Sequence, residues 1–361
     1  MMNVYLFILI LTVIVGVSIT GNKRNVDIIL LSRRHTNIRT IYCTLFAIAI
    51  ILLIGLRANS VGSDTLNYYN SYRLDNMSFS YFYSEYREYL KQGILNFMGE
   101  KNSLLFHLVF SFFSRLGFSF NTCLVVLASI YVTPIVYLIS KESDNVWKSC
   151  FWYLVINLSI SLTGVRISLA IGLTAISYIC LLKKKKIISV IVLSIAIMIH
   201  LSAIVFVGAF ILSKIKISRK LLMPLIPAFV IMPLIGRYVA PFLLSFTYHD
   251  SQDNQWNLPI YLFFSITSIL FLWSQDENRD KYLKMIIMGT IVCGLINFGA
   301  FGNLHKYYTQ YLCICLPGLF KNYNKSTRIM IELSYIIVGL YLFAKSYIWG
   351  SVFLPYKFFW Q

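Results

Sequence analysis

Long apolar runs separated by short basic loops set the pattern of this chain. Residues 1–20 and 40–56 are almost free of charge, and similar runs recur to the C-terminus. A helix of roughly 20 apolar residues crosses the hydrocarbon core of a bilayer. The pattern therefore predicts an all-α, polytopic integral membrane protein with about 11–12 transmembrane helices. No polar stretch is large enough for a soluble domain, so residues 1–361 are expected to form one membrane domain.

The first apolar run lacks a basic n-region and an A-x-A-like cleavage site, so it is expected to be a retained helix. The expected spans are residues 2–20, 40–56, 122–140, 149–164, 166–182, 187–199, 201–213, 221–240, 259–274, 283–300, 307–320 and 329–348. The four spans within residues 149–213 are short and form two adjacent hairpins, with Arg166 and His200 at their tips. Irregular backbone at membrane depth is tolerated where it is buried in protein or lines a wet cavity. The two tips are therefore expected to line one outward-facing cavity.

The loop charges predict which side each loop faces. Net charge is +18, with 32 Lys+Arg against 14 Asp+Glu, and most of the basic residues lie in short loops between apolar runs. This matches the positive-inside rule better than a nucleic-acid-binding protein, since no basic groove-binding module is present. Residues 103–117 are too short to span and carry His107 and Arg115, so an interfacial helix is expected there. Residues 57–121 and 241–258 then form outer loops, and Lys184 faces the cytoplasm.

Cysteine and histidine spacing gives no sign of a metal site. The seven cysteines lie in or beside apolar runs, none forms C-x-x-C, and no histidine joins them at zinc spacing. Small buried hydrophobes are the expected role of these cysteines. No metal and no cofactor is expected.

Charged residues gather on the predicted outer face: Arg57, Asp64, Arg166, His200 and His305. Charges beside membrane segments are costly and usually mark function. The planar guanidinium of arginine binds phosphate through two parallel hydrogen bonds. Histidine titrates near neutrality and suits proton transfer, while an aspartate can orient an arginine or act as a base. For His200, a buried ring bonded to a helix carbonyl is the structural alternative.

Aromatic residues accompany these charges in the outer loops. Tyr68 and Tyr69 belong to a tyrosine-rich stretch that fits either interface anchors or a platform for sugar rings. A third polar run, residues 302–308, contains His305, Lys306 and Tyr308. His305 and Lys306 fit either substrate contacts or side chains that reach the membrane boundary.

Three motifs resemble the EpsG-like family of Wzy-type polysaccharide polymerases, in order and spacing over nearly the whole chain. The first is the signature Arg57-x-x-x-Val61-Gly62-x-Asp64-Thr65-x-x-Tyr68. The second is Gly164-x-Arg166-x-x-x-Ala170, a lysine run, and His200-x-Ser202-Ala203. The third and weakest is Tyr308 followed by Leu316-Pro317.

The resemblance implies a polymerase of oligosaccharide repeats linked to undecaprenyl pyrophosphate, such as O antigen, capsule or exopolysaccharide units. Such an enzyme works at the outer face of the bacterial inner membrane. Its donor and acceptor are both lipid-linked oligosaccharides, membrane lipid surrounds it, and a chain-length regulator protein is a candidate partner. Arg166 would act with His200 or Asp64 as catalytic residues. The implied substrate-binding residues are Arg57, Tyr68, Tyr69, His305, Lys306 and Tyr308.

Two other classes of protein share part of this pattern. A flippase or transporter of lipid-linked oligosaccharide would also place basic residues in a cavity, with internal repeats and access from both sides. A membrane O-acyltransferase would place a histidine near lipid. A ligase that transfers glycan to another lipid differs from a polymerase only in its acceptor.

Overall fold

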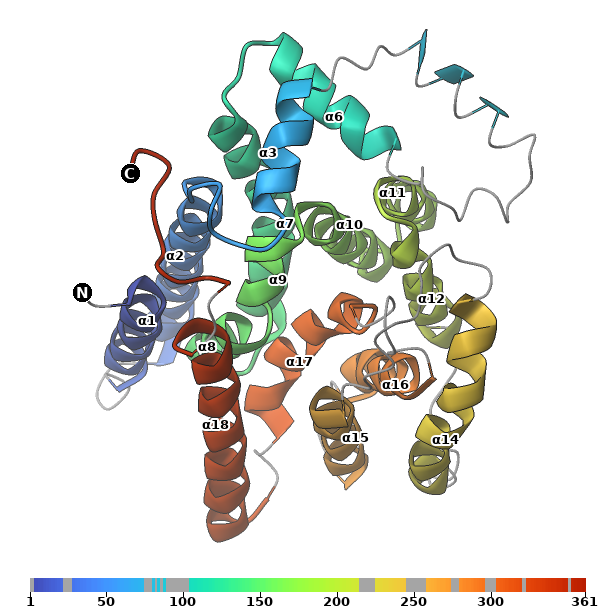
Figure 1. The fold of residues 1–361 in the computed structure, drawn as a ribbon. Coiled ribbons are helices and arrows are strands. Elements are labelled where there is room, and N and C mark those ends of the chain that lie inside the picture. Colours follow the sequence, from blue (N-terminus) through green and yellow to red (C-terminus); the bar gives the residue numbers. More distant parts are fainter. Residues whose placement is uncertain are drawn as a thin grey trace.

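The computed structural model describes residues 3–21, 28–74, 80–81, 83–84, 87–88, 104–213, 225–244, 258–273, 279–295, 303–319, 323–349 and 352–361. The described part is a bundle of helices (Figure 1). In chain order they are α1 (Val4–Gly21), α2 (Ile28–Gly55), α3 (Thr65–Leu74), α6 (Leu104–Arg115), α7 (Phe120–Glu142), α8 (Val146–Ile156), α9 (Leu158–Thr163), α10 (Val165–Leu182), α11 (Lys186–Ile199), the 3₁₀ helix η1 (Leu201–Phe206), α12 (Val207–Ser213), α14 (Leu225–Leu244), α15 (Leu258–Trp273), α16 (Arg279–Leu295), α17 (Lys306–Leu319) and α18 (Lys325–Tyr347).

The predicted all-α membrane architecture is confirmed. Within the described residues, four helical segments are long and apolar enough to cross a membrane by themselves: Ile38–Gly55 of α2, and α7, α10 and α18. Every other expected span overlaps one or more shorter helices. Parts of the predicted outer loops 57–121 and 241–258, mainly residues 75–79, 89–103 and 245–257, lie outside the described residues. The side of the membrane that each loop faces stays a prediction.

The expected span 149–164 is not one continuous helix. It breaks at Asn157, where α8 ends and α9 begins. The Asn157 side chain accepts a hydrogen bond from the Thr309 hydroxyl at 2.5 Å and donates one to the Cys313 sulfur at 3.0 Å. A buried amide needs such partners, and both come from α17. The break therefore ties α8 and α9 to the C-terminal part of the bundle.

The hairpin of α10 and α11 is fixed in register by two serines. The Ser177 hydroxyl donates to the Ser189 carbonyl at 2.7 Å, and the Ser189 hydroxyl donates to the Ser177 carbonyl at 2.6 Å. The turn between the helices runs through Lys184, which has a φ of 60°. With the lysine end held in this way, the opposite end of the hairpin brings together Arg166, at the start of α10, and His200, after α11.

Helices α3 and α6 lie together at one end of the molecule, and α6 extends from α3 toward α11 (Figure 1). Tyr68 and Tyr72 of α3 pack edge-on against Phe106 and Phe110 of α6, with ring centroids 5.4 to 6.4 Å apart. At 12 residues, α6 is too short to span a bilayer, as expected for residues 103–117. This layer covers the tip of the hairpin where Arg166 lies.

Candidate functional site

The first motif contacts the backbone of the segment that directly precedes the second motif. Gly62 has a φ of +93°, and a Cβ placed there would lie 2.1 Å from the Leu162 carbonyl oxygen. Only glycine adopts this conformation without strain and leaves room for the carbonyl. The Thr65 hydroxyl donates to the Val61 carbonyl at 2.7 Å and to the Leu162 carbonyl at 3.4 Å. The loop before α3 is thereby fixed against the segment that leads into Arg166.

Arg57 lies inside the protein, with no exposed surface. Its Nε donates to the Thr65 hydroxyl at 3.3 Å and its Nη1 donates to the Ile54 carbonyl, while Nη2 has no hydrogen-bond partner among the described residues. Burial lowers the pKa of Arg57 to about 10, so the guanidinium stays charged at neutral pH. The sequence suggested a substrate contact; the observed contacts of Arg57 are with the loop and helix that carry the first motif.

The C-terminal segment, residues 352–361, pairs with this loop. The Ala58 amide donates to the Lys357 carbonyl at 2.9 Å, and the Phe359 amide donates to the Leu56 carbonyl at 3.0 Å. Arg57 and Phe358 form the antiparallel bridge between these bonds. Sequence reasoning gave this segment no role, because its aromatic composition resembles an ordinary membrane boundary.

Arg166 lies between Tyr68 and His200. Burial raises the pKa of the Tyr68 hydroxyl, whereas the charge of Arg166 and a hydrogen bond with its side chain lower it. Burial and the charge of Arg166 both lower the pKa of His200, to about 4, so this imidazole is neutral at pH 7. Asp64 is exposed, accepts a hydrogen bond from Ser63 at 2.9 Å, and lies close enough to Tyr68 to raise its pKa. Four of the residues predicted for the site are therefore neighbours.

The guanidinium of Arg166 has a nitrogen that is not used in hydrogen bonds among the described residues. The residue is half-buried, and its Nε is buried without a hydrogen-bond partner among the described residues. A buried donor normally has a partner, and leaving it unpaired is costly. An anionic ligand with several oxygens would satisfy this nitrogen, and its charge would match that of the arginine.

The start of the third motif contacts η1, the helix that directly follows His200. The Ser202 and Tyr307 hydroxyls are hydrogen-bonded at 2.8 Å, and the Tyr308 hydroxyl donates to the Val205 carbonyl at 2.6 Å. Tyr308 also stacks on Phe206, with ring centroids 5.8 Å apart. These bonds hold η1, the element directly after His200, on the start of α17. Tyr308 is fully buried, and its hydroxyl forms a hydrogen bond within the protein in this structure.

The remaining predicted residues differ in placement. His305 is buried and directly precedes α17, and Lys306, the first residue of α17, is half-buried. Tyr69 packs on Phe120 at 5.5 Å and lies under the guanidinium of Arg73 at 5.8 Å, on a different side of α3 from Tyr68. The sequence did not single out Tyr307, because nothing in a Tyr-Tyr pair shows that both rings contact η1.

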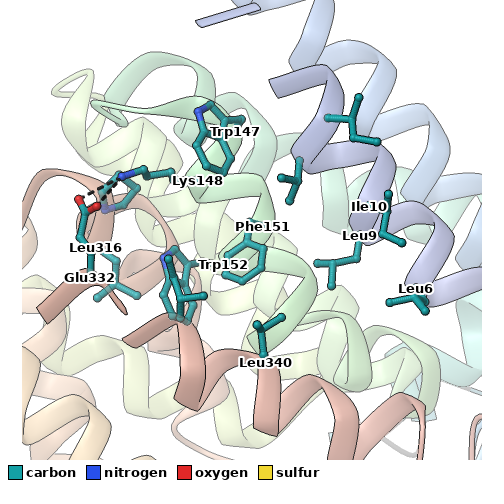
Figure 2. Close-up of a pocket in the computed structure, with 14 residues that line it drawn as sticks. Leu6, Leu9, Ile10, Trp147, Lys148, Phe151, Trp152, Leu316, Glu332 and Leu340 are labelled. Atoms are coloured by element: carbon teal, nitrogen blue, oxygen red, sulfur yellow. Dashed lines mark hydrogen bonds and ion pairs between the residues drawn. The ribbon is translucent and has the colours of Figure 1, made fainter. Parts of the chain in front are cut away.

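Two apolar cavities accompany this arrangement. The first, of about 540 Å³, is bounded by α6, α7, α10 and α11, and its lining includes Leu169 and Ile199. We call it the α6 groove. The second, of about 430 Å³, lies between α1, α8 and α18, with the Lys148–Glu332 ion pair at its edge (Figure 2). Within the described part of the chain, no group of three or more His, Cys, Asp or Glu could hold a metal ion.

The sequence model of the EpsG family matches residues 40–358. The match includes all three motifs and nearly all of the chain, so the protein belongs to this family, that of Wzy-type polysaccharide polymerases and EpsG-like proteins. Membership indicates a polysaccharide-polymerase-like function in a membrane-embedded protein. No curated protein and no solved structure matches the chain.

Proposed function

We propose that this member of the EpsG family polymerises oligosaccharide repeats carried on undecaprenyl pyrophosphate. The reaction takes place at the outer face of the bacterial inner membrane and builds O antigen or a related surface polysaccharide. The observation that carries this proposal is the Nε of Arg166, which has no hydrogen-bond partner among the described residues and lies beside neutral His200 and Tyr68.

In the proposed reaction, an acceptor sugar hydroxyl attacks the anomeric carbon of the donor glycan. The bond from this carbon to the pyrophosphate oxygen breaks, and undecaprenyl pyrophosphate leaves with the bonding electrons. Arg166 stabilises the negative charge that develops on the leaving group, in a half-buried setting where such interactions are strong. No metal is required by this scheme, since the guanidinium supplies the positive charge.

The proton of the acceptor hydroxyl passes to His200 or to Asp64. His200 is neutral and can accept a proton, but beside Arg166 it is a weak base. Burial is the larger cause of the lowered pKa of His200, and the charge of Arg166 is the second. A bound pyrophosphate would offset only that charge, and would therefore raise this pKa part of the way. Substrate binding would thus strengthen the base. Asp64 is exposed and stands within reach of Tyr68, which makes it the second candidate.

Arg57 takes a positioning role in this scheme. Its guanidinium holds Thr65, and Thr65 holds the loop on the Leu162 carbonyl. Removing the Arg57 side chain would take away the donor to the Thr65 hydroxyl oxygen and to the Ile54 carbonyl, so the loop would shift relative to Arg166.

The direct test is the surface glycan of a bacterial strain that lacks this chain. A polymerase predicts that only single-repeat glycan remains and that the ladder of longer chains disappears. Return of the native gene should restore the ladder. Loss of the single-repeat product as well, with lipid-linked repeats kept on the cytoplasmic side, would indicate a flippase and contradict the proposal.

A further inference from the structure

We propose that the α6 groove binds the polyprenyl chain of the lipid-linked substrate, an inference that rests on the proposed function. The groove is bounded by four helices, and its lining is apolar except for Arg115 at the end of α6. Its volume, about 540 Å³, suits a chain-like apolar ligand. Nothing in its chemistry suits a sugar.

The groove continues directly from the proposed site. Leu169 lies one helical turn beyond Arg166 on α10, Leu173 lies one turn further, and Ile199 directly precedes His200. The distance along α10 from Arg166 to Leu173 is about 10 Å, at the rise of an ideal helix. A ligand whose phosphates bind Arg166 would therefore place the first part of an attached chain along Leu169 and Leu173.

The groove is also open to the surrounding medium. Phe112 of α6 is 58% exposed and Ile195 of α11 is 38% exposed, and both line it. In a membrane these side chains meet lipid, so a long chain could enter sideways without crossing polar surface. One anionic end beside one extended apolar path matches a single-chain polyprenyl pyrophosphate.

The test compares substrates that carry the same repeat unit on an undecaprenyl or a short geranyl pyrophosphate. Native protein should show a much lower KM for the undecaprenyl substrate. Ile195→Trp and Leu173→Trp fill the groove from two helices, and excluding even two methylene groups weakens binding by about tenfold. Both variants should therefore raise KM for the undecaprenyl substrate about tenfold or more, and by a larger factor than KM for the geranyl substrate, whose two isoprene units reach only the first part of the groove.

The control variant, Leu340→Trp, fills the other cavity at a side chain that is 44% exposed (Figure 2). It should leave both KM values near native. The three variants are compared as single, monodisperse species in size-exclusion chromatography. Equal KM values for the two substrates in native protein, or an equal rise for both in the groove variants, would overturn the groove assignment while leaving polymerisation intact. Failure of native protein to elongate either substrate would instead overturn the proposed function, and the inference with it.

Discussion

The two motif arginines have different surroundings and therefore different expected roles. Arg57 is fully enclosed and directs two of its nitrogens at Ile54 and Thr65. Arg166 is half-buried and keeps its Nε free of partners within the described part of the chain. The sequence predicted both as phosphate ligands, because residue type shows charge and geometry but not enclosure. This difference is the reason for proposing Arg166, and not Arg57, as the ligand of the pyrophosphate.

Replacement of Arg166 should remove polymerisation without removing the protein from the membrane. Arg166→Ala is expected to lower the rate by about 10² to 10³, the usual effect of losing a donor to developing charge. Arg166→Lys should retain only part of the native rate, because an ammonium group lacks the planar geometry that forms two parallel hydrogen bonds. Arg73→Ala removes an exposed arginine of α3 and should stay near native. Ladder formation measured at equal membrane levels checks this, and full activity of Arg166→Ala would exclude Arg166 from the site.

His200 gives a pH prediction with a defined sign. Its pKa is lowered to about 4 by burial and by Arg166, so activity should fall only as pH drops toward that value and the imidazole gains a proton. If bound pyrophosphate offsets Arg166, the acidic limb of kcat should lie at higher pH than the limb of kcat/KM, because the two report the bound and free enzyme. Both limbs should be absent in the residual activity of His200→Gln. Near-native polymerisation by this variant would favour Asp64 as the base.

At the scale of elements, the hairpin of α10 and α11 was the most predictable part. The expected spans 166–182 and 187–199, joined by the lysine run, match α10 and α11. The sequence assigned these spans to two adjacent hairpins with Arg166 and His200 at separate tips, whereas the structure brings both residues to one end of the α10–α11 pair. The sequence could not predict the Ser177–Ser189 pair that fixes its register, because buried serines look like any small residue in an apolar run. The break at Asn157 was missed for a related reason: its partners Thr309 and Cys313 lie far away in the chain.

The contact between the first motif and the segment before the second predicts a difference between two glycines. Gly62→Ala would force a Cβ against the Leu162 carbonyl, which is backbone and cannot swing away. Gly117→Ala meets nothing within 4 Å, although Gly117 also has a positive φ of +74°. Both substitutions bear a backbone cost of about 1–2 kcal/mol. Only Gly62→Ala should in addition push the loop before α3 away from the Leu162 carbonyl, and so away from the segment that leads into Arg166.

The two glycine variants are measured side by side for thermal stability and for ladder formation. We expect a clear loss of polymerisation for Gly62→Ala and a small stability loss alone for Gly117→Ala. Equal behaviour of the two variants would show that the approach to Leu162 does not support the site.

At the scale of the whole molecule, the site depends on segments from both ends of the chain. The loop at Arg57 pairs with residues 352–361, and α17 holds η1 beside His200. The sequence predicted the membrane spans, since hydropathy is a local property. It could not predict the pairing of the C-terminal segment, because backbone hydrogen bonds leave no residue signature. That the motifs meet was expected from loop charges and is supported by the bonds between them.

The orientation in the membrane can be measured with single cysteines. Lys184→Cys, in the turn between α10 and α11, should react only with reagents that reach the cytoplasm. Asn67→Cys, on an exposed position of α3, should react from outside the cell. Six of the seven native cysteines are buried and Cys180 is half-buried, so the protein without an added cysteine is labelled in parallel and should give no signal with membrane-impermeant reagents. Labelling of position 184 from outside would reverse the predicted topology and place the site on the cytoplasmic face.

The most direct test of the account uses purified protein in proteoliposomes with one lipid-linked repeat as the only substrate. We expect the native protein to form glycan of two or more repeats on a single lipid, with one undecaprenyl pyrophosphate released for each new linkage. The Arg166→Ala variant should form neither product at a comparable rate. Movement of intact lipid-linked repeats across the bilayer without any new linkage, or elongation that is independent of Arg166, would contradict the account.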